Sequence, residues 1–166
     1  MAVISLAKDL QQPIHQALAL LPAVEIQNLN LKSFKEKIVE LDEEFREALY
    51  HLSVICKYLI RENGFAVVKK LSQTPDARAL VAVAMEVGHI FQDTSHQSTT
   101  VLEASPNISP QLQGNQTEPL FMHTDFAMLE NPPAVTMVMC QRPDPIPGFG
   151  RNGITLAQNI VSRIFG

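Results

Sequence analysis

The chain has 166 residues, of which 46% are hydrophobic and 18% are charged. This length and composition suffice for one domain with a sizeable core, and they exclude a disordered tail. The formal net charge of −4 argues against a surface for nucleic acids or anionic membranes, because both require a basic patch. We therefore expect neither a nucleic-acid partner nor a membrane partner.

Two cysteines, Cys56 and Cys140, lie far apart in apolar stretches. We expect a reduced, buried pair rather than a disulfide, and hence a cytoplasmic protein. The N-terminal residues lack the basic region of a signal peptide, and no apolar run reaches the roughly 20 residues that span a bilayer. Neither a signal peptide nor a transmembrane helix is expected.

A helical pattern and a strand pattern open the chain. Apolar residues at helical spacing predict a short helix over residues 14–21, which Pro22 ends. Residues 24–31 half-alternate between apolar and polar side chains, which predicts a strand.

The clearest pattern is an amphipathic helix that begins near Ser33. Ser33 and Glu36 fit a capping box, and apolar residues then recur every three or four positions. We predict one long helix that stops at Asn63-Gly64, because glycine can take the left-handed conformation that closes a helix. Residues 65–68 are predicted to form a buried strand directly after it.

A further helix is predicted to start at Thr74-Pro75-Asp76, where a hydroxyl, a proline and an acid suit a first turn. It is expected to end at Gly88. Residues 89–118 are polar and lack a sustained period, which predicts mainly loop. A long irregular stretch in a compact domain is often functional.

Two strands are predicted over residues 119–126 and 134–140, and a final helix from about residue 154 onwards. The alternating side chains of the second strand make Val135, Met137 and Met139 core candidates. A turn rich in proline and glycine separates this strand from the final helix.

The first of these strands carries the most specific chemistry. In a strand, side chains two positions apart share a face, so His123 and Asp125 would be able to hold one metal ion. One imidazole and one carboxylate are two of the three ligands of the 2-His-1-carboxylate triad, which binds Fe(II) and leaves three positions open.

The surrounding sequence resembles the metal-binding region of Fe(II)/2-oxoglutarate-dependent oxygenases. It is most similar to the group of taurine dioxygenase, γ-butyrobetaine hydroxylase and clavaminate synthase. The similarity covers roughly residues 35–160 and is most specific over residues 119–145. The motifs that carry it are Phe121-Met122-His123-Thr124-Asp125, Asn131-Pro132-Pro133, the strand ending in Cys140, and Gln141-Arg142-Pro143-Asp144-Pro145.

This resemblance implies an α+β fold, a partial double-stranded β-helix (jelly roll) with flanking N-terminal helices. It makes His123 and Asp125 the first two ligands of Fe(II), with 2-oxoglutarate as cosubstrate. The implied reaction is the hydroxylation or a related oxidation of a C–H bond in a small molecule. A threonine of the family contacts 2-oxoglutarate, and Thr155 falls in about that place, although a helix cap explains it equally well.

The chain departs from the family pattern because no histidine follows His123. The arginines that follow, Arg142, Arg151 and Arg163, come too early for the family's 2-oxoglutarate contact. We therefore expect residues 1–166 to be one domain, the incomplete N-terminal part of an oxygenase. Such a part would be nearly inactive alone, and it would aggregate or need a second chain to complete its sheet.

Other candidates carry less weight. His89 and His96 are possible substitutes for the third ligand, whereas His15 and His51 are interpreted as helix-surface or packing residues. Two further residues are candidates for the pocket lining, Glu103 and Asn107. The alternative functions are a non-catalytic remnant that serves as an interaction module and one half of a split oxygenase.

Overall fold

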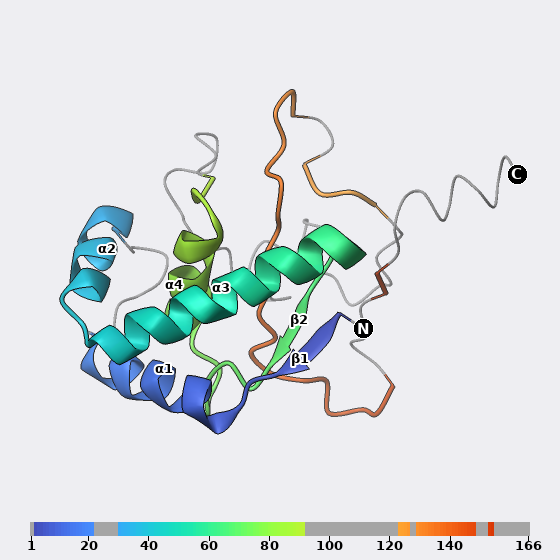
Figure 1. The fold of residues 1–166 in the computed structure, drawn as a ribbon. Coiled ribbons are helices and arrows are strands. Elements are labelled where there is room, and N and C mark those ends of the chain that lie inside the picture. Colours follow the sequence, from blue (N-terminus) through green and yellow to red (C-terminus); the bar gives the residue numbers. More distant parts are fainter. Residues whose placement is uncertain (1, 22–29, 92–122, 127–128, 149–152, 155–166) are drawn as a thin grey trace, which may run out of the picture.

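A computed structural model describes residues 2–21, 30–91, 123–126, 129–148 and 153–154. The described part is mainly helical (Figure 1). Its elements are, in chain order, β1 (Val3–Ser5), α1 (Lys8–Leu20), α2 (Leu31–Val39), α3 (Glu43–Asn63), β2 (Val67–Lys69) and α4 (Ala77–Val87).

The first predicted helix is present as α1, and it ends just before Pro22 as expected. It begins earlier than the apolar spacing indicated, at Lys8, and contains Pro13. Residues 22–29 of the strand predicted over 24–31 lie outside the described part. Its last two residues do not form a strand, because Asn30 caps α2 and Leu31 begins that helix.

The single long helix predicted from Ser33 is wrong, because α2 and α3 are separate helices set at an angle (Figure 1). The predicted capping box is wrong as well. The Asn30 side chain accepts from the Ser33 amide at 3.0 Å, so Ser33 lies inside α2. Asp42 accepts from the Glu44 amide at 3.3 Å and starts α3. Asparagine and aspartate are strong N-caps, and each one here begins a helix.

The predicted end of the long helix is confirmed. Gly64 has a φ of 79° and its amide donates to the Ile60 carbonyl at 2.8 Å, which closes α3 in the left-handed conformation. The strand predicted over 65–68 is observed as β2, shifted towards the C-terminus. β2 pairs in parallel with β1, a strand that we did not predict, in the register Val3↔Val67.

The predicted jelly roll is wrong for the part of the chain that the structure describes. A jelly roll is built from antiparallel strands, whereas β1 and β2 form a two-stranded parallel sheet whose connection runs through three helices. His123 to Phe126 form a loop and a turn, and residues 134–140 form no strand with the described residues.

The alternating pattern of residues 134–140 has another cause. Met137 and Met139 are half-buried against the hydrophobic core, while Val138 between them is 82% exposed. One face of this segment therefore packs on the hydrophobic core, which produces the same period of two as a strand in a sheet. Val135, the third core candidate of this segment, is exposed instead.

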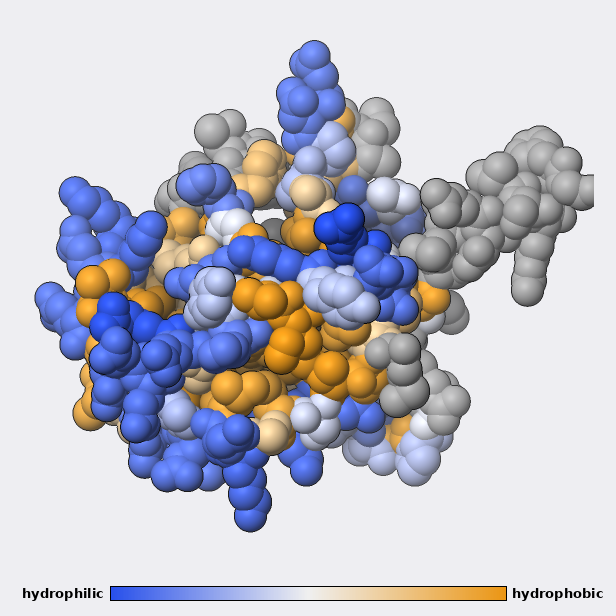
Figure 2. All heavy atoms as spheres, viewed as in Figure 1, coloured by the Kyte–Doolittle hydropathy of each residue, from blue (hydrophilic) through white to orange (hydrophobic). Residues whose placement is uncertain are grey.

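Helix α3 is the centre of the molecule and packs against α1 and α4. α4 ends at Gly88 as predicted, but its cap is Asp76 rather than Thr74. In the view of Figure 2, hydrophobic residues gather in the middle of the face that α3 crosses, with hydrophilic residues around them. The largest fully buried side chains are Phe45, Ile14, Leu49, Leu52, Val81 and Ser53.

Ser53 is the polar member of this buried set, and its hydroxyl donates to the Tyr50 carbonyl at 2.8 Å. None of the described helices combines the length and the apolar character that crossing a membrane requires.

Candidate functional site

The structure brings His123 and Asp125 together. Nε2 of His123 lies 3.1 Å from Oδ1 of Asp125, and each side chain is 49% exposed. A turn at Asp125 and Phe126 produces this proximity, not the alternation of a strand. Both side chains therefore face one solvent-accessible place at which a ligand can reach them.

Phe126 shapes the turn. Its φ of 58° is in the left-handed region, which a bulky residue occupies only at an energetic cost. The Leu129 amide donates to the Phe126 carbonyl at 3.0 Å, and the Phe126 ring packs edge-on to Phe91, with centroids 6.0 Å apart. The hydrogen bond closes the turn locally, and the ring contact joins the His123–Asp125 loop to the segment that follows α4.

The distance between His123 and Asp125 suits metal binding. When two donor atoms each lie about 2.1 Å from a metal ion and the donor–ion–donor angle is a right angle, the donors are about 3.0 Å apart. The same distance also suits a hydrogen bond or an ion pair between imidazole and carboxylate. In the described ranges, no group of three or more His, Cys, Asp or Glu side chains is placed to hold an ion. The pair therefore fits two coordination positions, with no third protein ligand in that part of the chain.

Of the other candidate residues that the structure describes, none joins His123 and Asp125 in a group that could hold a metal ion. His89 is exposed just after α4, His51 is exposed on α3, and His15 is half-buried on α1. The last two observations agree with their interpretation as helix-surface or packing residues. Four candidates lie outside the described residues, namely Thr155, His96, Glu103 and Asn107.

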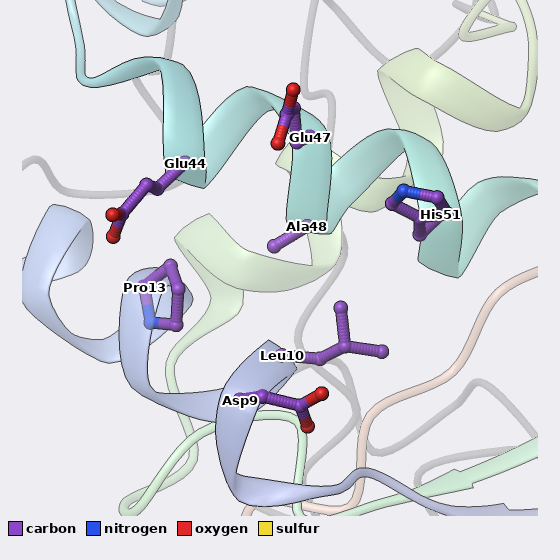
Figure 3. A pocket seen from close by; sticks show the side chains of 7 residues that line it. All are labelled: Asp9, Leu10, Pro13, Glu44, Glu47, Ala48 and His51. Carbon is purple, nitrogen blue, oxygen red and sulfur yellow. The ribbon is translucent and has the colours of Figure 1, made fainter.

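A second feature, which the sequence did not lead us to expect, is a hollow between α1 and α3. Its volume is about 300 Å³, and its polar lining comes from Asp9, Glu44, Glu47 and His51 (Figure 3). The side chains of Glu44 and Glu47 point away from one another, and Asp9 projects from the opposite helix. The sequence does show that Glu44, Glu47 and His51 are spaced to lie on one side of a helix. It does not show that α1 lies opposite them, and the hollow depends on that position.

The two cysteines differ in their surroundings. Cys56 is buried in the core as predicted, whereas Cys140 is exposed, so the predicted burial of Cys140 is wrong. Both are free thiols, and burial raises the pKa of the Cys56 thiol. A raised pKa keeps Cys56 protonated and unreactive at neutral pH.

Comparisons of this chain with protein-family models, with curated protein sequences and with solved structures give no match. The resemblance to the Fe(II)/2-oxoglutarate oxygenases therefore remains a prediction that rests on the sequence motifs. The geometry of His123 and Asp125 is an independent observation, and it concerns the metal pair alone.

Proposed function

We propose that His123 and Asp125 bind a divalent metal ion, Fe(II), and that the protein acts as a 2-oxoglutarate-dependent oxygenase on a small molecule. The observation that carries the proposal is the 3.1 Å separation of Nε2 and Oδ1. The His-x-Asp motif and its flanking sequence supply the choice of metal and cosubstrate. The proposal concerns the chemistry of the site and makes no use of the predicted jelly roll.

The two side chains would have different roles. The neutral imidazole of His123 would donate a lone pair to the ion, and the carboxylate of Asp125 would also offset part of its charge. Bound Fe(II) and 2-oxoglutarate would together supply the activation of oxygen. The half-exposed position of both side chains leaves room for these ligands and for a substrate.

Two protein ligands make a weak site, because metal affinity depends on the number of ligands and on the residues that orient them. 2-Oxoglutarate chelates a metal through its keto oxygen and the neighbouring carboxylate, so it should strengthen binding of the ion to the His123–Asp125 pair. Succinate lacks the keto oxygen and should not. The dependence on 2-oxoglutarate therefore separates the proposed site from an ordinary ion pair.

The experiment measures the protein-bound fraction of Mn(II), a spectroscopic substitute for Fe(II), by the loss of the free-ion EPR signal. We expect binding that 2-oxoglutarate increases and succinate does not, and that His123→Ala or Asp125→Asn removes. The matched controls are His89→Ala and Asp144→Asn, which change an exposed histidine and an exposed aspartate elsewhere. Equal binding by His123→Ala and the unchanged protein would contradict the proposal.

The catalytic part of the proposal is tested separately by succinate release from 2-oxoglutarate with Fe(II) and oxygen. With two protein ligands we expect at most slow release from this chain, and what is released should depend on His123. Release that persists in His123→Ala would assign the activity to a contaminant or to free iron.

A second candidate function is an interaction module. It is favoured by a row of exposed apolar side chains on α3, Tyr50, Val54 and Tyr58.

We also propose a reducing compartment, the cytoplasm, because Cys56 and Cys140 are both free thiols.

A further inference from the structure

The outer face of α3 carries large apolar side chains that the fold leaves exposed. Tyr50, Val54 and Tyr58 are 61%, 46% and 62% exposed. They are four residues apart, so they form one stripe along the helix. The buried residues of α3, which include Leu49, Leu52 and Cys56, lie on the opposite side of the helix. The stripe is therefore not a part of the core of this chain.

Charges of opposite sign lie at the two ends of this stripe. Glu47 precedes Tyr50 by three residues, and Arg61 follows Tyr58 by three residues. Both are exposed, and neither forms a salt bridge with another residue in the described part of the chain. The stripe thus has Glu47 at one end and Arg61 at the other, with apolar side chains between them. Two further exposed residues flank it in the reverse order of charge, Arg46 four residues before Tyr50 and Glu62 four residues after Tyr58, and an antiparallel copy would oppose these two as well.

The positions in the stripe are symmetric about Val54. Tyr50 and Tyr58 are each four residues from it, and Glu47 and Arg61 are each seven residues from it. An antiparallel copy of α3, related by a two-fold axis at Val54, would place Tyr50 against Tyr58 of the copy. It would also place Glu47 against Arg61 of the copy. Because of the two-fold symmetry, this contact occurs twice, once on each side of Val54.

We propose that this stripe, Glu47-Tyr50-Val54-Tyr58-Arg61, is the interface of an antiparallel two-fold dimer of this chain. A two-fold interface uses the same patch on both subunits and must therefore be complementary to itself. The charge order along α3 has this property in the antiparallel orientation, whereas a parallel pair would oppose acid to acid and base to base. A foreign partner would not require the symmetry about Val54.

The side chains suit such a contact. Val54 lies at the centre, where helices 8–10 Å apart need small residues at the crossing point. The tyrosines supply large apolar surfaces while their hydroxyls remain at the wet edge. Lys57 would lie opposite His51 of the copy, but its Nζ donates to the Glu86 carbonyl at 2.8 Å, which turns it towards α4. No charge of like sign is therefore placed across the central contact.

The interface is small, since one helix face from each subunit forms most of it. We expect a reversible dimer with a dissociation constant on the order of 10 µM. Sedimentation equilibrium of the full chain at increasing concentration should show conversion of monomer to dimer. Val54→Glu should weaken association about tenfold or more, because it buries two carboxylates next to each other on the axis.

The controls make the same chemical changes elsewhere. Val39→Glu places the same carboxylate at another exposed valine, on α2, and should leave the dimer unchanged. Glu36→Arg makes the same change of charge as Glu47→Arg at an exposed position of α2. The two control positions, Val39 and Glu36, are exposed, and circular dichroism checks that each variant is folded.

Charge reversal gives the decisive result. Glu47→Arg alone opposes arginine to arginine, and Arg61→Glu alone opposes glutamate to glutamate, so each variant should be monomeric. An equimolar mixture of the two single variants should form a heterodimer, and the double variant Glu47→Arg/Arg61→Glu should form a homodimer. A protein that stays monomeric up to about 500 µM, or single variants that dimerise like the unchanged chain, would overturn the proposal.

Discussion

The guanidinium of Arg78 joins the beginning of α4 to the end of α1, because its Nη1 atom donates to the Leu21 carbonyl at 2.6 Å. The same side chain donates from Nε and Nη2 to the carboxylate of Asp76, which also caps α4. One fork-shaped cation thus satisfies a helix C-terminus and an N-cap residue at the same time.

We expect Arg78→Ala to lower the free energy of unfolding by about 2 kcal/mol, because it removes the guanidinium that donates to a partly buried carboxylate and to a helix-end carbonyl. Arg78→Lys should recover only part of this loss, since an ammonium cannot donate in the same planar fork. Urea denaturation followed by circular dichroism measures both. A loss below about 0.5 kcal/mol for Arg78→Ala would show that the contact contributes little.

The pair of Asp76 and Arg78 also predicts a pH dependence. Partial burial alone would raise the pKa of Asp76, but the hydrogen bonds and the charge of Arg78 outweigh it and lower the pKa below its ordinary value of 3.8. The folded state thus binds this proton less readily than the unfolded state does. The resulting stabilisation is present above the ordinary pKa and is lost as the pH falls through the lowered value.

Asp76→Asn removes this ionisation and serves as the comparison. The difference in unfolding free energy between the unchanged protein and Asp76→Asn should narrow as the pH falls from about 6 towards 3. A difference that is constant over this range would mean that Asp76 has the same pKa in the folded and unfolded states.

The C-terminal end of α3 gives a test of backbone conformation. Gly64 has a φ of 79°, so Gly64→Ala should cost about 1 kcal/mol, because a Cβ is disfavoured in the left-handed region. The matched control is Gly88→Ala at the end of α4, where the backbone is extended and a new Cβ would meet no atom within 4 Å. Thermal unfolding should separate the two variants, and equal midpoints would contradict the assigned conformation of Gly64.

The core around α3 is tested by truncating Leu52, which is 0% exposed. Leu52→Ala should lower the unfolding free energy by about 2–5 kcal/mol, since it removes buried methyl groups and leaves a cavity. Leu20→Ala is the same substitution at a side chain that is 73% exposed, and it should have little effect. Similar losses for both variants would mean that the packing of α3 differs from that described.

Parts of the helical fold were predictable because their signals are local. Asn63-Gly64 and Gly88 end helices where glycine was expected to do so. The break between α2 and α3 was not predictable from spacing, because Leu41 continues the apolar period across it. β1 has three residues, too few to show a period, and only its pairing with β2 identifies it as a strand.

The prediction of a jelly roll was wrong because a period of two in the apolar residues does not reveal what an extended segment packs against. Met137 and Met139 pack against the hydrophobic core, so the alternation that suggested a jelly-roll strand has a different partner. The proximity of His123 and Asp125 was expected from a strand but arises from a turn. Their role as metal ligands remains a prediction, as does the oxygenase function.

The measurement that tests this role most directly is an Mn(II) titration of the isotope-labelled protein followed by NMR. A bound paramagnetic ion broadens the signals of nearby amides, so it locates even a weak site. We predict broadening centred on residues 123–126 that His123→Ala abolishes and His89→Ala does not. Broadening centred instead on the hollow of Asp9, Glu44 and Glu47, with the amides of residues 123–126 unaffected, would contradict the proposed metal site.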